Sequence, residues 1–165
     1  MPALTPLEVE AIGLSLKVAF WSVLVSLPIG IYVAWLLARR DFIGKTALNG
    51  LVHLPLVLPP VVVGYLLLLL LGRQGPLGTL LFDLFGVTVI FSWKGAAVAS
   101  AVMAFPLMVR AIRLSLEAVD TGLEAAARTL GARRIRVFLT ITLPLASPGI
   151  LAGIILGFAR SLGEF

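Results

Sequence analysis

The chain has 165 residues, of which 60% are hydrophobic and 13% are charged. Soluble domains carry about 25% charged residues, so this composition excludes an ordinary soluble protein and indicates an integral membrane protein. The sequence has no cysteine, which excludes a disulfide framework and any thiolate nucleophile or thiolate metal site, and its single histidine, His53, cannot build a metal site by itself, so we expect none. The formal net charge is +5, but the basic residues gather at the ends of apolar runs, where they indicate membrane topology rather than nucleic-acid binding.

The first apolar run predicts a membrane-spanning helix. Residues 18–38 are uncharged and long enough, at 1.5 Å per residue, to cross about 30 Å of hydrocarbon. We expect the helix to cover residues 11–38 and to bend at Pro28, which removes one backbone hydrogen bond. Arg39 and Arg40 follow it directly. Positive charge at this end predicts that it is cytoplasmic and that the N-terminus lies outside.

The second apolar run begins with an unusual density of proline. Residues 46–72 carry no charge and predict a span over residues 54–72. Pro55, Pro59 and Pro60 fall within six residues. Irregular backbone at membrane depth persists only against protein or a water-filled cavity, so Pro59 and Pro60 are candidate residues of a translocation pathway. The alternative is a helix that simply begins at one of these two prolines.

A turn rich in glycine and proline follows, and then a short apolar segment. Residues 79–88 are too few to span a bilayer, and we expect an interfacial or re-entrant piece. Residues 90–113 predict the third span, in which Pro106 permits a bend. Small residues recur at every fourth position of this span, a pattern typical of close helix contacts. They are Ala96, Ser100 and Ala104.

The longest polar run of the chain occupies residues 124–144, within a predicted cytoplasmic loop over residues 114–144. Thr121 and Glu124 have the spacing of a capping box and predict the start of a helix, which Gly131 ends. A second, amphipathic helix is expected to follow and to end at Pro144. Its predicted apolar face holds Ile135, Phe138, Leu139 and Thr142, and its polar face holds Arg133, Arg134 and Arg136. Arginine is in excess over acidic residues between positions 110 and 136, which predicts that this loop is cytoplasmic.

Residues 145–165 predict a fourth span. Gly149, Gly153, Gly157 and Ser161 form a stripe of small residues, which predicts tight helix packing. Arg160 and Glu164 lie roughly 23 to 29 Å along a straight helix from its cytoplasmic end. Ionisable groups at such depth are candidate pathway residues, and the alternative is a pair that neutralises itself near the outer interface. Phe165 falls inside an apolar segment, so we expect the natural chain to continue.

The polar run resembles a known motif. Glu124-Ala125-Ala126, then Gly131, then Ile141-x-Leu143-Pro144 reproduces the spacing of the EAA loop of binding-protein-dependent ABC importer permeases. In that family the loop forms a cytoplasmic coupling helix that docks on the ATP-hydrolysing subunit. The resemblance implies coupling roles for Glu124, Ala125, Ala126, Ala127, Gly131, Arg133 and Arg134. The simpler alternative is that Glu124 only caps a helix and Gly131 only ends it.

Two further stretches, residues 54–78 and 158–165, resemble molybdate-type permeases within this family, and sulfate permeases share the second pattern. The resemblance adds Gly64 to the candidate pathway. It implies a single transmembrane permease domain over residues 1–165: an all-α, polytopic transmembrane helical bundle of the type I ABC importer permease kind, C-terminally incomplete. It also implies a homodimer with two ATP-binding subunits and a periplasmic or extracellular oxyanion-binding protein. The implied substrate is molybdate or tungstate, with sulfate, thiosulfate or another anion as the alternative.

The sequence contains no GxxxxGK[ST] phosphate-binding run. We therefore expect a non-catalytic subunit of the inner cell membrane, with no cofactor and no nucleic-acid partner, whose ATPase is a separate chain. Two alternatives belong to other classes of protein. A channel or secondary transporter would show internal repeats and several paired charges inside the membrane. A membrane scaffold would bind a cytoplasmic partner without moving solute.

Overall fold

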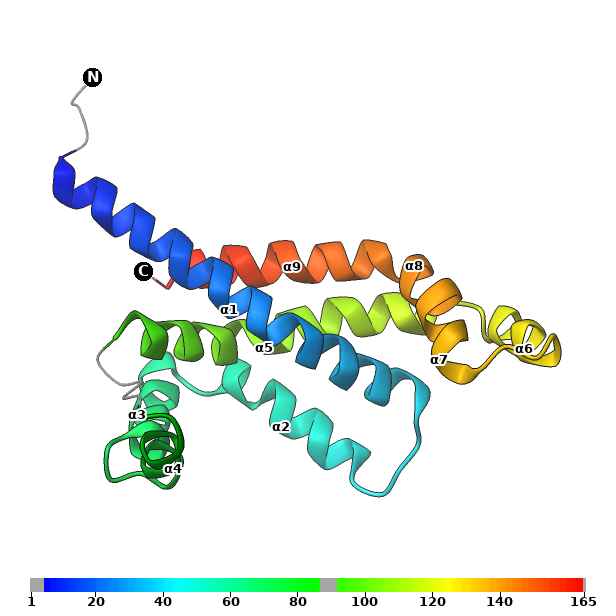
Figure 1. The fold of residues 1–165 in the computed structure, drawn as a ribbon, viewed down its shortest axis with the longest axis horizontal. Coiled ribbons are helices and arrows are strands. Elements are labelled where there is room, and N and C mark those ends of the chain that lie inside the picture. The colour runs from blue at the N-terminus through cyan, green and yellow to red at the C-terminus, as the bar shows by residue number, and fades with distance from the viewer. Residues whose placement is uncertain (1–4, 87–91, 165) are drawn as a thin grey trace.

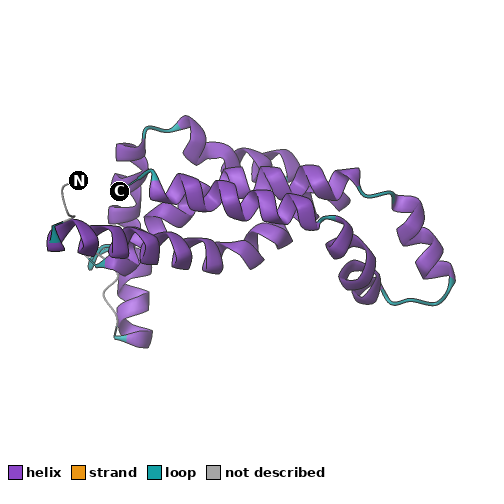
Figure 2. Ribbon diagram, turned by 90° about the horizontal axis from the view of Figure 1, so that it is seen from above, coloured by secondary structure: helices purple, strands orange, loops and turns teal. Residues whose placement is uncertain are grey.

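The computed structural model describes residues 5–86 and 92–164, and in this part of the chain all regular structure is helical (Figure 2). The predicted all-α architecture is therefore confirmed. The first residues of the predicted third span, Ile90 and Phe91, and the final Phe165 lie outside the described residues. In chain order the elements are α1 (Pro6–Arg39), α2 (Lys45–Val57), α3 (Pro60–Leu71), α4 (Pro76–Phe85), α5 (Trp93–Ala118), α6 (Thr121–Thr129), α7 (Arg134–Val137), the π-helix η1 (Phe138–Thr142), α8 (Leu143–Leu145) and α9 (Ser147–Leu162).

Three long helices, α1, α5 and α9, pack side by side and form the core (Figure 1). The short helices α6 and α7 lie at one end of this bundle, and α3 and α4 lie near the other. Apolar side chains fill the contact between the long helices. The largest fully buried ones are Leu37 of α1 and Met108, Ile112 and Leu116 of α5. The core therefore holds the end of α1, including Arg39, beside the end of α5 that leads into α6.

The outward surfaces of the long helices are strongly apolar. Phe20, Leu24, Val25 and Ile29 of α1 are each about half exposed, although a contiguous apolar surface of this kind is unfavourable in water. Helices α1 and α5 are each long and apolar enough to cross a membrane. The exposed apolar surface and the helix lengths agree with an integral membrane protein.

The second predicted span is a pair of helices rather than one. Residues 54–72 are shared between α2 and α3, whose axes differ by 116° at the break between Val57 and Pro60. Pro59 precedes α3 in an extended conformation, and Pro60 is its first residue. Proline in a first turn costs no hydrogen bond, because that amide has no helical partner. The structure therefore contains both features that the sequence left open, a helix beginning at Pro60 and a sharp break before it.

Small residues bring α9 against α5. Gly149, Gly153 and Gly157 are buried, and a Cβ atom on Gly149 would lie 2.1 Å from Cβ of Ser115 and 2.8 Å from the carbonyl oxygen of Ala111. No side chain fits in that space. The two backbones can approach this closely only because the position is glycine.

A cluster of buried hydroxyl groups joins the same three helices. Ser161 of α9 hydrogen-bonds Ser100 of α5, and its hydroxyl lies 3.0 Å from that of Ser22 of α1. Ser22 also donates to the carbonyl oxygen of Ala19. Buried hydroxyl groups are costly unless they are paired, and this cluster pairs them across α1, α5 and α9.

Candidate functional site: the Glu124 cluster

Asp120 is the N-cap of helix α6. One carboxylate oxygen of Asp120 accepts a hydrogen bond of 2.7 Å from the amide of Gly122, as an N-cap residue does. The predicted capping box of Thr121 and Glu124 is therefore wrong, because Thr121 is already the first helical residue. The short side chain of Asp120 occupies the capping position, which leaves the carboxylate of Glu124 free to bind groups outside its own helix.

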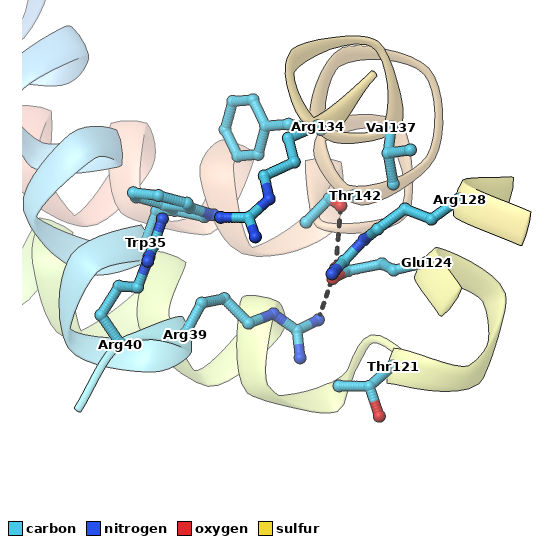
Figure 3. Close-up of a pocket in the computed structure, with 10 residues that line it drawn as sticks. Trp35, Arg39, Arg40, Thr121, Glu124, Arg128, Arg134, Val137 and Thr142 are labelled. Atoms are coloured by element: carbon cyan, nitrogen blue, oxygen red, sulfur yellow. Dashed lines mark hydrogen bonds and ion pairs between the residues drawn. The ribbon is translucent and has the colours of Figure 1, made fainter. Parts of the chain in front are cut away.

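Glu124 connects α6 to two other elements. Its carboxylate lies 2.9 Å from the guanidinium of Arg39 at the end of α1 and accepts a hydrogen bond of 2.9 Å from the hydroxyl of Thr142 in η1 (Figure 3). Arg128, one turn further along α6, lies 3.5 Å from its second oxygen. Glu124 is 8% exposed. A nearly buried carboxylate must be paired, and two of its three partners, Arg39 and Thr142, are distant in the sequence.

Arg39 ties the same region to the end of α5. Its guanidinium donates a hydrogen bond of 3.0 Å to the carbonyl oxygen of Val119, the residue that follows α5. One side chain of α1 thus contacts the connection before α6 and a carboxylate within α6. A movement of α6 relative to the bundle would have to stretch or break these contacts.

Gly131 ends α6 as its sequence position predicts. The glycine has φ of +84°, a conformation that costs other residues free energy, and its amide donates to the carbonyl oxygen of Arg128. The amide of Ala132 donates to the carbonyl oxygen of Ala127. The chain can therefore turn sharply between α6 and α7.

The second part of the polar run differs from its prediction. The helical path does not end at Pro144 but continues through η1 and α8 to Leu145. Its buried positions are Val137 and Thr142, five residues apart, whereas Ile135 is 74% exposed. The π-helix explains both corrections, because i→i+5 spacing changes which residues share a face and alters the hydrogen-bond ladder before the proline.

Two large apolar side chains are exposed on α6 and at its C-cap, beside the exposed polar residues Thr121, Arg128 and Thr129. Leu123 is 50% exposed and Leu130 is 89% exposed, while Ala125 and Ala126 are also exposed and Ala127 is half-buried. The carboxylate Glu124 thus faces inward, and the large apolar residues Leu123 and Leu130 face outward. Helix α6 lies at the end of the molecule (Figure 1). Exposed leucines combined with a buried carboxylate are typical of a surface that binds another protein.

A pocket of about 330 Å³ lies beside the Glu124 cluster. Arginines dominate its polar lining, which holds Arg39, Arg40, Arg128 and Arg134 around Glu124 (Figure 3). Trp35 and Phe138 form an apolar wall, with their ring centroids 6.0 Å apart and their planes nearly perpendicular. The predicted coupling residue Arg134 lines this pocket, and Arg133 is exposed at the start of α7.

The predicted pathway residues do not join this cluster. Pro59, Pro60 and Gly64 lie at the break before α3 and in its first turns, and α3 is placed away from α6 (Figure 1). Arg160 and Glu164 form an ion pair of 3.3 Å at the end of α9. Ser161 of the predicted packing stripe lies between them in sequence and belongs to the buried hydroxyl cluster.

Sequence reasoning missed two partners of Glu124. It took Arg39 only as a topology signal and Thr142 only as part of an apolar face. Arg39 lies 85 positions before Glu124, and no local pattern connects them. The one available signal is the need of an inward-facing carboxylate for a cation, and several arginines meet that need equally well.

The family that matches the chain and three of its relatives are all named for transport. Residues 26–165 match the family described as binding-protein-dependent transport system inner membrane component. The molybdenum transport system permease proteins ModB of Escherichia coli K12 and Haemophilus influenzae are 65% and 64% identical to the chain, over 98% and 96% of its length and 71% and 69% of theirs. The sulfate transport system permease protein CysT of Salmonella typhimurium is 39% identical over 97% of the chain and 57% of its own length.

Proposed function

Because the chain belongs to the family of binding-protein-dependent transport system inner membrane components, we propose that it is the permease subunit of an ATP-driven oxyanion importer. The proposed substrate is molybdate or tungstate. The observation that carries this choice is the 64–65% identity to permeases named for molybdenum transport, against 39% to a sulfate permease. A difference in sequence identity of this size, across nearly the same residues, favours molybdate over sulfate as the substrate.

The proposed coupling element is the surface of α6. The exposed leucines Leu123 and Leu130 fit an apolar groove on a separate ATP-binding subunit. Ala125 and Ala126 would allow close approach, Gly131 would permit the turn that presents the helix, and Arg133 and Arg134 would lie at the rim. Glu124 acts from behind this surface, because it holds α6 to Arg39 and Thr142.

The proposed orientation places α6 in the cytoplasm and the N-terminus outside. Six arginines lie between positions 110 and 136, against Glu117, Asp120 and Glu124, and an excess of this kind is typical of cytoplasmic loops. The four proposed spans are α1, the bent pair of α2 and α3, α5, and the bent segment that ends in α9.

The proposed pathway includes the break before α3. Pro59, Pro60 and Gly64 would line it, because broken helices inside a membrane are stable where they border protein or water. Arg160 and Glu164 would supply charged contacts, and the stripe from Gly149 to Ser161 would let α9 slide against α5. A second copy of the chain and an external oxyanion-binding protein would complete the transporter.

The substrate is tested by ATPase activity in a reconstituted complex. The subunit, its ATPase and its binding protein are placed in liposomes, and ATP hydrolysis is measured with molybdate, tungstate or sulfate presented by the binding protein. We expect molybdate and tungstate to stimulate hydrolysis and sulfate to have little effect. Stimulation by sulfate alone would contradict the substrate, and stable complex formation without anion-dependent hydrolysis or uptake would favour a scaffold.

A further inference from the structure

Two neighbouring hollows on the surface share one wall. The first is the arginine-lined pocket beside Glu124, and the second is an apolar groove of about 500 Å³ between α1 and the α7–η1 segment. Both are lined by the same four residues, Trp35, Arg40, Arg134 and Phe138. The two hollows therefore adjoin at this wall, and together we call them the Trp35 site, of which the first is the cationic end and the second the apolar end.

The cationic end is lined by more arginines than carboxylates. Arg39 and Arg128 pair with Glu124. Within residues 5–86 and 92–164, neither Arg40 nor Arg134 forms an ion pair with a carboxylate. Arg40 instead lies over the ring of Trp35, 5.4 Å from the ring centroid, and Figure 3 shows Arg134 extending toward Trp35 from the opposite side. Two exposed guanidinium groups are thus available to bind one anion between them.

The apolar end has a lining suited to an acyl chain. Beyond the shared residues it is lined by Pro28, Ile31, Tyr32, Ile135 and Leu139. From Pro28 to Arg40, α1 rises roughly 18 Å, so the groove runs from the charged end of α1 toward the middle of its apolar stretch. Tyr32 and Trp35 stand between the two ends, and amphipathic rings of this kind favour the headgroup level of a bilayer.

We propose that the Trp35 site binds an anionic phospholipid, with the phosphate between Arg40 and Arg134 and one acyl chain along the groove. Charge complementarity selects an anionic headgroup, since a zwitterionic lipid carries its own cation. The adjoining groove selects a lipid over free phosphate, which would leave the apolar wall uncovered. The site requires only that the chain lies in a membrane, so it stands or falls separately from the transport role. A bound lipid would brace α7 against α1 beside the Glu124 contacts.

The test uses the purified full chain and native mass spectrometry with phosphatidylglycerol or with phosphatidylcholine of the same acyl chains. We expect retention of phosphatidylglycerol over phosphatidylcholine, and roughly a 30-fold weaker retention in the double variant Arg40→Gln, Arg134→Gln, since each arginine near an anionic lipid contributes about 1 kcal/mol. The control Arg110→Gln, Arg136→Gln removes the same charge outside both hollows and should retain the lipid. Leu139→Trp, which fills the groove without changing charge, should also lower retention.

The position of the bound lipid is tested with phosphatidylglycerol that carries a photoreactive group in its acyl chain. We expect crosslinks to peptides containing Ile135 or Leu139, and competition by unlabelled phosphatidylglycerol but not by inorganic phosphate. Equal retention by the Arg40, Arg134 variant and its control would overturn the proposal. Crosslinks found only in other peptides, or displacement of the lipid by inorganic phosphate, would also overturn it. A lipid-free dimer, in which a second copy of the chain covers the groove, would overturn it too.

Discussion

Replacing Glu124 with glutamine should reduce oxyanion uptake by about tenfold or more, the consequence of losing roughly 1.4 kcal/mol or more from a largely buried ion pair. The amount of protein in the membrane should stay close to that of the wild type. Glu124 lies outside the spanning helices, so insertion does not depend on it. The measurement is uptake of labelled molybdate by vesicles, normalised to the subunit present.

The physical reason is that the carboxylate charge holds α6 in place. Glutamine can still accept a hydrogen bond from Thr142, but it cannot neutralise Arg39, whose side chain is 13% exposed. An unpaired charge at that position would draw water or swing outward, and α6 would lose its fixed orientation. The exposed leucines would then be presented to the ATPase in many orientations instead of one.

Two further variants separate a positioning role from direct contact with the ATPase. Arg39→Gln removes the same ion pair from the α1 side and should reduce uptake to a similar extent. If Glu124 acted only by touching the ATPase, Arg39→Gln would be harmless, and that result would contradict the positioning role. Glu117→Gln is the matched control, because it breaks a more exposed pair with Arg113 and should change uptake little.

Gly149→Ala should destabilise the bundle by roughly 1 to 3 kcal/mol, because the added methyl group meets atoms that cannot move aside easily. The new Cβ would lie 2.1 Å from Cβ of Ser115 and 2.8 Å from the backbone oxygen of Ala111. Helices α5 and α9 must therefore separate near α8. Thermal denaturation in detergent, followed by helical circular dichroism or by loss of the monodisperse peak, measures the effect.

A matched glycine supplies the control for this variant. Gly13 of α1 has no atom within 4 Å of its added Cβ, so Gly13→Ala should be neutral or slightly stabilising. Adding Ser115→Gly to Gly149→Ala removes the closest contact and should restore part of the lost stability. Equal thermal stability of Gly149→Ala and Gly13→Ala would show that the two helices are not in the close contact described above.

Much of the helix framework could be predicted from residue patterns alone. Uncharged runs indicated the long apolar helices α1 and α5, because a bilayer core leaves few alternatives to helix. The stripe from Gly149 to Ser161 indicated which face of α9 is small, and that face lies against α5. Both inferences need only local information, namely apolar length and helical period.

Features that depend on distant partners could not be predicted. Thr121 and Glu124 have capping spacing, but Asp120 takes the cap and Glu124 binds Arg39 across 85 positions. The sequence indicated a break near Pro59 without specifying the 116° between α2 and α3. A π-helix before Pro144 has no reliable sequence signal, and it shifted the predicted buried face of α7 and η1.

The Glu124 cluster also explains how one short motif can serve two purposes. The carboxylate faces inward and fixes α6 to α1, while Leu123 and Leu130 remain exposed on the outside. Local patterns indicated a helix of the right length and place. That Glu124 faces inward while the leucines face outward becomes clear only when Arg39, at the end of α1, is placed beside α6.

Site-specific cross-linking tests whether the outer face of α6 docks on a separate ATPase. The chain contains no cysteine, so a single cysteine introduced at Leu130, which is 89% exposed, gives an unambiguous probe. In membranes holding the complete complex, Leu130→Cys should cross-link to the ATPase subunit, and Leu77→Cys in α4 should not. Absence of a cross-link from Leu130→Cys, or equal cross-linking from Leu77→Cys, would show that α6 does not dock on the ATPase through this face.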